Sequence, residues 1–176
     1  MAAVSIVIIT YARQDLLRAC LDTCTPQTSA IPGGFEIVVV DNNPAGTARP
    51  LVEEIAAAAP VPVRYVHETK PGIPNARNAG IHATESPFIA FVDDDQTITP
   101  DWLELMTRAI EAERVDCLFS NVEPVYSKPG LSPAKAVADS YRRYRGQRGS
   151  GGTLFRRDTC ATDANPFDPA MAFTGG

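Results

Sequence analysis

The sequence has few of the residues that build metal clusters or disulfide frameworks. Its 176 residues include four cysteines and two histidines, no two cysteines have the C-x-x-C spacing, and neither histidine lies near a cysteine. We therefore expect buried free thiols in a reducing compartment, rather than a zinc site or a disulfide-stabilised secreted fold.

Long apolar runs are also absent. No segment approaches the roughly 20 apolar residues that a membrane-spanning helix needs. The short run 4–9 lacks the basic flank of a signal peptide. These absences predict a cytoplasmic protein, or one at the cytoplasmic face of a membrane. With 44% hydrophobic and 21% charged residues, the composition is that of a globular domain large enough to bury a core.

Acidic residues are scarce in one region only. Residues 128–157 contain eight lysines and arginines but a single acid, Asp139, although the whole chain has a net charge of −5. A basic segment on an acidic body predicts an anionic partner, such as phosphate groups or a peripheral membrane surface. Nucleic acid is not an expected partner, because the acidic remainder would repel a long polyanion.

Apolar runs and helical patterns alternate over the first 95 residues or so. The patterns predict buried strands at 4–9, 35–40, 61–66 and 88–92, and helices at 14–24, 49–59 and 73–84. This alternation is typical of an α/β fold with a doubly wound, mainly parallel sheet and helices on both faces. Further along, we expect a helix capped by Thr99 that ends near Glu113, a strand at 116–126, a basic helix at 132–145 and a glycine-rich loop at 146–152.

Three consecutive aspartates, Asp93, Asp94 and Asp95, follow the strand expected at 88–92. Adjacent carboxylates repel one another, so a positive group is expected among them. A divalent cation such as Mg²⁺ or Mn²⁺ is a natural candidate, because it takes oxygen ligands and commonly binds a diphosphate as well. The alternative is a solvated loop that caps the next helix, since short motifs have many false matches.

Polar side chains also follow the first and second expected strands. They are Thr10, Tyr11 and Arg13 after the first strand, and Asp41 after the second. Because the carboxyl ends of parallel strands share one edge of the sheet, we expect these residues to line one ligand crevice with the aspartates. Arg77 lies on the helix before the aspartates. Its planar fork suits a phosphate, or alternatively an internal ion pair with Asp41 or Asp93.

Four segments carry a family resemblance, in the order V-S-I-V-I-I-T-Y-A-R, F-E-I-V-V-V-D-N-N, A-R-N-A-G-I and F-I-A-F-V-D-D-D. They resemble the family 2 glycosyltransferases of the GT-A fold. The resemblance continues through G-G-T-L-F-R-R to the final F-D-P-A-M-A-F-T-G-G. One departure is that the second strand of this family more often ends in D-D-G-S. Here Asp41 keeps the first position, and Asn42 replaces the second carboxylate.

The resemblance implies a metal-assisted, inverting transfer of a sugar from a UDP-, GDP- or dTDP-linked donor. The acceptor would be the hydroxyl of a sugar, a lipid-linked molecule or another anionic compound. Residues 1–97 would form the half that binds the nucleotide-sugar, and residues 98–176 the acceptor-side half of the same domain.

The resemblance also implies roles for single residues. Those at the base and ribose are Thr10, Tyr11, Arg13 and Asp41, with Asp41 accepting a hydrogen bond from a uracil- or thymine-like N–H. Arg77 would lie near the base or the diphosphate, and Asp93 would face the ribose or the sugar. Asp94 is also expected to bind the donor. Asp95 would ligate Mg²⁺ or Mn²⁺ in the D-x-D motif.

The catalytic base is expected beyond Gly176. In the resembled family, the stretch equivalent to 167–176 is followed at once by an acidic pair, and one member of that pair serves as the base. We therefore expect the amino-terminal part of a longer enzyme, which retains donor binding. Asp163 and Asp168 are poor substitutes, because the motif assigns them other positions.

Two other functions fit part of the pattern. A non-catalytic module could bind a sugar nucleotide in the same crevice. Alternatively, Asp93-x-Asp95-x-Thr97 matches the D-x-D-x-T signature of haloacid-dehalogenase-like phosphatases, with Asp93 as nucleophile and Asp95 as general acid. That family usually places the motif on its first strand, however, and too little chain follows here to supply its remaining acids and lysine.

Overall fold

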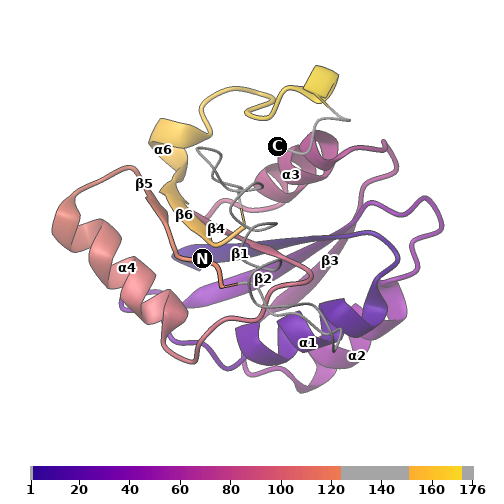
Figure 1. Cartoon of the computed structure of the whole chain (residues 1–176), viewed down its shortest axis with the longest axis horizontal. Helices are drawn as coiled ribbons and strands as arrows, with labels where there is room; N and C mark the ends of the chain where they lie inside the picture. Colours follow the sequence, from indigo (N-terminus) through magenta and orange to yellow (C-terminus); the bar gives the residue numbers. More distant parts are fainter. Residues whose placement is uncertain (1, 124–150, 172–176) are drawn as a thin grey trace, which may run out of the picture.

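The computed structural model describes residues 2–123 and 151–171 (Figure 1). The described strands form one six-stranded sheet in the order β3-β2-β1-β4-β6-β5. They are β1 (Val4–Thr10), β2 (Phe35–Asp41), β3 (Val63–His67), β4 (Phe88–Asp93), β5 (Cys117–Phe119) and β6 (Thr153–Arg156). The strands from β3 to β4 in this order are parallel, whereas β6 is antiparallel to both β4 and β5. The mainly parallel α/β sheet predicted from the sequence is confirmed.

Helices cover both faces of this sheet. They are α1 (Gln14–Cys24), α2 (Arg49–Ala58), α3 (Ile73–His82), α4 (Trp102–Glu113), the short α6 (Arg157–Cys160) and the 3₁₀ helix η1 (Pro169–Met171). Helices α1, α2 and α4 pack on one face, and α3 packs on the other (Figure 1). In the described part of the chain, no helix is both long and apolar enough to cross a membrane.

Alternate residues of each central strand supply two separate cores, because successive side chains of a strand point to opposite faces. In β1, Ile6 and Ile8 pack in the core that contains Leu17 of α1, whereas Val7 packs in the core that contains Ile81 of α3. A strand that is buried on both faces is mostly apolar, which explains the β-branched runs at 6–9 of β1 and 37–40 of β2.

The register of the parallel strands brings their carboxyl ends to one edge of the sheet. Thr10 of β1 lies opposite Asp41 of β2, and Ile9 of β1 lies opposite Asp93 of β4. The strand ends that were expected to meet therefore do meet, on the edge where open α/β sheets bind their ligands.

The start of α4 differs from the sequence prediction. The helix begins at Trp102, and Asp101 rather than Thr99 occupies the position before its first residue. The Thr99 hydroxyl instead donates a hydrogen bond to the Asp101 carboxylate at 2.9 Å. The predicted Thr99 cap is therefore wrong, because this hydroxyl is used within the turn that precedes the helix.

The sequence prediction is also wrong about the antiparallel edge. In the described residues up to 123, the strand expected at 116–126 covers only Cys117–Phe119, where it pairs with residues 153–155 of β6. Residues 124–126 lie outside the described part of the chain. Strand β6 was not predicted from the sequence, because four residues are too few to show a clear hydrophobic periodicity. The helix expected at 132–145 and most of the loop expected at 146–152 lie outside the described residues.

Candidate functional site

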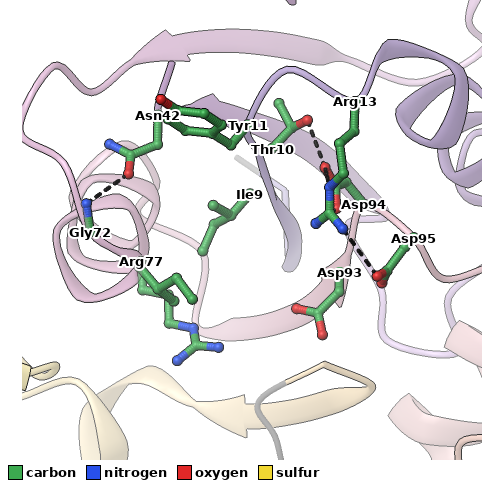
Figure 2. A pocket seen from close by; sticks show the side chains of 11 residues that line it. Ile9, Thr10, Tyr11, Arg13, Asn42, Gly72, Arg77, Asp93, Asp94 and Asp95 are labelled. Carbon is green, nitrogen blue, oxygen red and sulfur yellow. Dashed lines mark hydrogen bonds and ion pairs between the residues drawn. The ribbon is translucent and has the colours of Figure 1, made fainter. Parts of the chain in front are cut away.

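A cavity of about 580 Å³ lies at the carboxyl ends of β1, β2 and β4 (Figure 2). This volume is within the range of small-molecule binding sites. Among the residues predicted for the site, its lining contains Thr10, Tyr11, Arg13, Arg77, Asp93, Asp94 and Asp95. The lining residues that were not predicted are Ile9, Asn42, Gly72 and Ile73. The structure thus brings together every predicted site residue except Asp41.

Asp94 is completely buried and is held by the turn between β1 and α1. Thr10 Oγ1 donates to Asp94 Oδ2 at 2.7 Å. Arg13 donates to both carboxylate oxygens, through Nε at 3.2 Å and through Nη2. Between them, Ala12 has a φ of 53°, a left-handed conformation that is uncommon for a residue other than glycine. Burial raises the pKa of Asp94, while the bonds from Thr10 and Arg13 act in the opposite direction.

Asp95 is more loosely held than Asp94. Its side chain is half exposed and contacts Arg13, whose Nη1 lies 3.2 Å from Asp95 Oδ2. One guanidinium therefore binds two of the three consecutive aspartates (Figure 2). The positive group expected among these carboxylates is supplied, in this structure, by Arg13.

Arg77 and Asp93 lie on the opposite side of the cavity from Tyr11 (Figure 2). Arg77 is only 6% exposed, yet its guanidinium has no hydrogen bond or ion pair with the described residues. Its Cζ atom lies 5.1 Å from the centre of the Phe167 ring. Burial lowers the pKa of Arg77 and raises that of Asp93, and each opposes the shift of the other. The alternative of an Arg77 ion pair with Asp41 or Asp93 is not observed, so the guanidinium is available to an anion.

Asp41 does not line the cavity. Its buried carboxylate accepts hydrogen bonds from the backbone N–H groups of Asn43 at 2.9 Å and Ala48 at 2.8 Å, and from the Tyr65 hydroxyl at 3.1 Å. Burial, with the Asp41 charge, raises the pKa of Tyr65 to about 12, so Tyr65 donates as a neutral phenol. Asp41 thus shapes the connection between β2 and α2. A contact with a nucleobase would require these bonds to rearrange.

Asn42 has a role that the sequence analysis missed. Its Nδ2 donates to the carbonyl oxygens of Glu68 at 2.8 Å and Lys70 at 2.7 Å, and its Oδ1 accepts from the Gly72 N–H at 3.0 Å. The side chain therefore fixes the loop that carries Gly72 and Ile73 to the cavity. An ionised aspartate could not make the two donations. The departure from the D-D-G-S pattern was the only sequence signal for this role.

Two residues of the basic segment have partners within the fold. Arg157 donates to three backbone carbonyl oxygens around the end of α3. Arg156 donates to Glu111 at 3.0 Å and lies over the Phe88 ring. For these two residues, the prediction that they face an anionic partner is wrong. The other cations of the segment lie outside the described residues.

The cavity offers oxygen ligands for a metal, but it lacks a complete ligand set. In residues 2–123 and 151–171, no cluster of three or more His, Cys, Asp or Glu side chains is arranged to hold an ion. The Asp93 carboxylate accepts no hydrogen bond from these residues, and Asp95 accepts one, from Arg13. These two carboxylates fit Mg²⁺ or Mn²⁺, provided that diphosphate oxygens and water complete the coordination shell.

Comparison with known proteins identifies the family. The sequence profile described as "Glycosyl transferase family 2" matches residues 5–162. This chain belongs to the family 2 glycosyltransferases. The succinoglycan biosynthesis protein ExoM of Rhizobium meliloti is 32% identical over 185 residues, which cover 98% of this chain and 58% of ExoM. Membership of this family decides against the phosphatase alternative.

Solved structures of glycosyltransferases show the same fold. Residues 1–349 of S. aureus TarS, in complex with UDP, match with a TM-score of 0.72 and 19% identity, over 99% of this chain and 52% of that chain. The mannosyltransferase PcManGT of Pyrobaculum calidifontis, in complex with GDP-Man and Mn²⁺, matches with a TM-score of 0.67 and 21% identity, over 89% and 45%. The fold is therefore that of the GT-A glycosyltransferases. This family 2 chain spans about half the length of the proteins it matches.

Proposed function

We propose that this chain binds a nucleoside diphosphate-sugar in the cavity and transfers the sugar to an acceptor hydroxyl, with inversion at the anomeric carbon. Family membership and the fold support this proposal. So do the printed ligands of two structural neighbours, UDP for TarS and GDP-Man for PcManGT. The observation that carries it is the buried guanidinium of Arg77, which has no hydrogen-bond acceptor among residues 2–123 and 151–171 and lines the same cavity as three carboxylates.

A diphosphate group matches this distribution of charge. Arg77 offers a planar fork of N–H donors, which phosphate oxygens accept in pairs. Asp93 and Asp95 would repel the same phosphates unless a cation lay between them. The cavity is therefore suited to a diphosphate that contacts Arg77 on one side and a cation on the other.

We assign that cation to Asp95, with Asp93 beside it. When bound there, Mg²⁺ or Mn²⁺ would stabilise the negative charge that develops on the leaving nucleoside diphosphate. The Mn²⁺ in the PcManGT complex is consistent with such an ion. Arg77 would stabilise the same developing charge from its own side, and both groups would favour departure of the diphosphate.

The nucleobase is assigned to the outer part of the cavity. Tyr11 is 55% exposed and Ile73 is 40% exposed, and both line the cavity. Large apolar side chains that remain exposed at a cavity are suited to pack against the flat face of a base. Thr10 and Arg13 are already bonded to Asp94, so they would support this region of the site rather than bind the base directly.

The acceptor and the cellular location are inferred from the charge of the chain and from its free thiols. The acceptor hydroxyl loses a proton to a carboxylate base as it attacks the anomeric carbon. The basic residues in 128–148 make an anionic or lipid-linked acceptor the favoured class. The free thiols of Cys20 and Cys24, which are both buried, support a reducing compartment such as the cytoplasm.

The test is calorimetric titration with UDP, GDP and dTDP, each with and without Mn²⁺. We expect one nucleotide to bind at least about tenfold more tightly with Mn²⁺, and we expect Asp95→Asn to remove that gain. Asp101→Asn is the matched control, because Asp101 lies six residues further along, directly before α4, and does not line the cavity. Equal affinities with and without Mn²⁺ would overturn the metal-bridged donor. Sugar transfer from the corresponding nucleotide-sugar, assayed separately, would decide against the non-catalytic module.

A further inference from the structure

We propose that Arg13 is a tethered counter-cation, which a divalent metal must displace from Asp95 before it can bind there. The chain would then restrain its own metal binding until a diphosphate is present. This inference rests on the metal role proposed for Asp95. It concerns the positive group that binds Asp94 and Asp95 when no metal is bound.

One end of the Arg13 side chain is firmly anchored. Nε and Nη2 bond the two oxygens of Asp94, the bidentate geometry that makes arginine–carboxylate pairs strong. Asp94 is completely buried and also accepts the Thr10 hydroxyl, so leaving this carboxylate without Arg13 would be costly. Arg13 is therefore expected to remain bonded to Asp94 both with and without a bound metal.

The other contact of Arg13 is weak by comparison. A single 3.2 Å contact joins Nη1 to Asp95 Oδ2, and the two side chains are 47% and 50% exposed. Exposed ion pairs of this kind are easily exchanged, because water and salt screen them. The guanidinium can thus release Asp95 without releasing Asp94. This asymmetry separates the roles of two adjacent aspartates: Asp94 anchors the arginine, and Asp95 is the carboxylate that changes partner.

The arrangement has a consequence for the order of binding. A metal that arrives alone must replace Nη1 at Asp95 and then remain close to the positive charge of Arg13, which weakens its binding. A diphosphate brings negative charge to the same place and offsets this repulsion. Metal and diphosphate should therefore strengthen the binding of each other, and by linkage the two effects are equal.

The experiment measures the affinity for Mn²⁺ alone, by electron paramagnetic resonance of the free ion. The decisive variant is Arg13→Gln combined with Asp94→Asn, because it removes the tether and its anchor without changing the net charge. Both replacements keep hydrogen-bonding groups next to Thr10. We expect this double variant to bind Mn²⁺ about three- to tenfold more tightly than the unaltered chain. Arg18→Gln is the control: Arg18 lies on α1, the helix that follows Arg13, but pairs with Glu54, and its loss should leave the affinity unchanged.

Two further variants keep the outcomes distinct. Arg13→Lys retains a charge for Asp94 but lacks the fork that reaches both aspartates, so it should change Mn²⁺ affinity in the same direction by a smaller factor. If the double variant does not fold, the Mn²⁺ affinity of Arg13→Lys alone tests the tether.

Asp95→Asn should abolish the tight Mn²⁺ site. If Asp95→Asn weakens binding while the double variant and Arg13→Lys match the unaltered chain, the tether is refuted and the metal site survives. If Asp95→Asn has no effect, the metal role of Asp95 fails, and this proposal fails with it.

Discussion

The side-chain amide of Asn78 pairs with the backbone of Phe167 through two hydrogen bonds. Nδ2 donates to the Phe167 carbonyl oxygen at 2.8 Å, and Oδ1 accepts from the Phe167 N–H at 3.0 Å. The same Phe167 ring lies 5.1 Å from the guanidinium carbon of Arg77 and packs edge-on against Phe91. These two hydrogen bonds form a clamp between Asn78 and Phe167. The clamp attaches residues 161–171 to α3, beside Arg77, which we assign to the diphosphate.

Asn78→Asp should release this segment. An ionised aspartate cannot donate to the Phe167 carbonyl oxygen and would repel it, at a cost of about 1–3 kcal/mol. We expect faster hydrogen exchange of the backbone amides in residues 161–171, measured by mass spectrometry. Asn75→Asp is the matched control, because the Asn75 amide also donates to a backbone carbonyl oxygen, that of Pro71, but in an exposed hydrogen bond. Unchanged exchange in Asn78→Asp would show that the clamp does not hold the segment.

Arg77→Met should separate phosphate binding from base binding. Methionine fills part of the same buried space without the charge, so we expect UDP affinity to fall roughly tenfold to a hundredfold while uridine affinity is kept. The free energy of unfolding should be maintained or should rise, because the substitution removes a buried charge that forms no hydrogen bond with the described part of the chain. Calorimetry with both ligands and urea denaturation measure these effects, with Arg108→Met on α4 as the control. Equal losses for UDP and uridine would contradict a diphosphate role.

Glu36 should make the stability of the fold depend on pH. Burial raises the pKa of Glu36, but hydrogen bonds from Arg64, Ser5 and Thr84 outweigh this effect and leave the pKa below its ordinary value. A carboxyl group with a lowered folded-state pKa stabilises the fold above the unfolded pKa, near 4.3 for glutamate, and this stabilisation is lost as the pH falls through the folded-state value.

Glu36→Gln isolates this contribution. We expect it to reduce the free energy of unfolding by about 1 kcal/mol at pH 7, and we expect the difference to shrink as the pH falls below about 4. Urea denaturation at several pH values measures it. Glu53→Gln is the control, because Glu53 is exposed and forms only an ion pair within α2. A difference that stays constant between pH 7 and pH 3 would rule out the ionised form as its source.

Gly80→Ala should destabilise the fold although it improves helix propensity. A Cβ atom at this position would overlap the side chain of Val7 and would lie 3.2 Å from Val40 Cγ2. Alanine is favoured over glycine in a helix by about 1 kcal/mol, whereas overpacking costs about 1–3 kcal/mol. We expect a net loss of up to about 2 kcal/mol in urea denaturation. A more stable variant would show that α3 can move away from the sheet without cost.

The sequence was sufficient to predict the framework of the site. The β-branched run at 6–9 of β1 indicates burial on both faces, and that burial is what a parallel sheet with two helical layers requires. Once the strands are known to be parallel, Thr10 and Asp93 must lie at the same edge, because each ends its own strand. The antiparallel β6 was not predictable in this way, since its four residues take their conformation from pairing with β4.

By itself, the sequence determined the helices and parallel strands of the first 95 residues and the edge at which their polar ends collect. Local periodicity encodes both, because it depends on neighbours a few positions apart. Only the tertiary structure decided which carboxylate is used for what. Asp41 is enclosed by its own loop and Tyr65, and Asp94 is bound to Arg13 from 81 positions earlier. Arg77 is buried, and none of the residues that the structure describes accepts a hydrogen bond from it. These differences depend on distances and burial between residues far apart in the chain, and side chains with the same chemistry therefore came to have different roles.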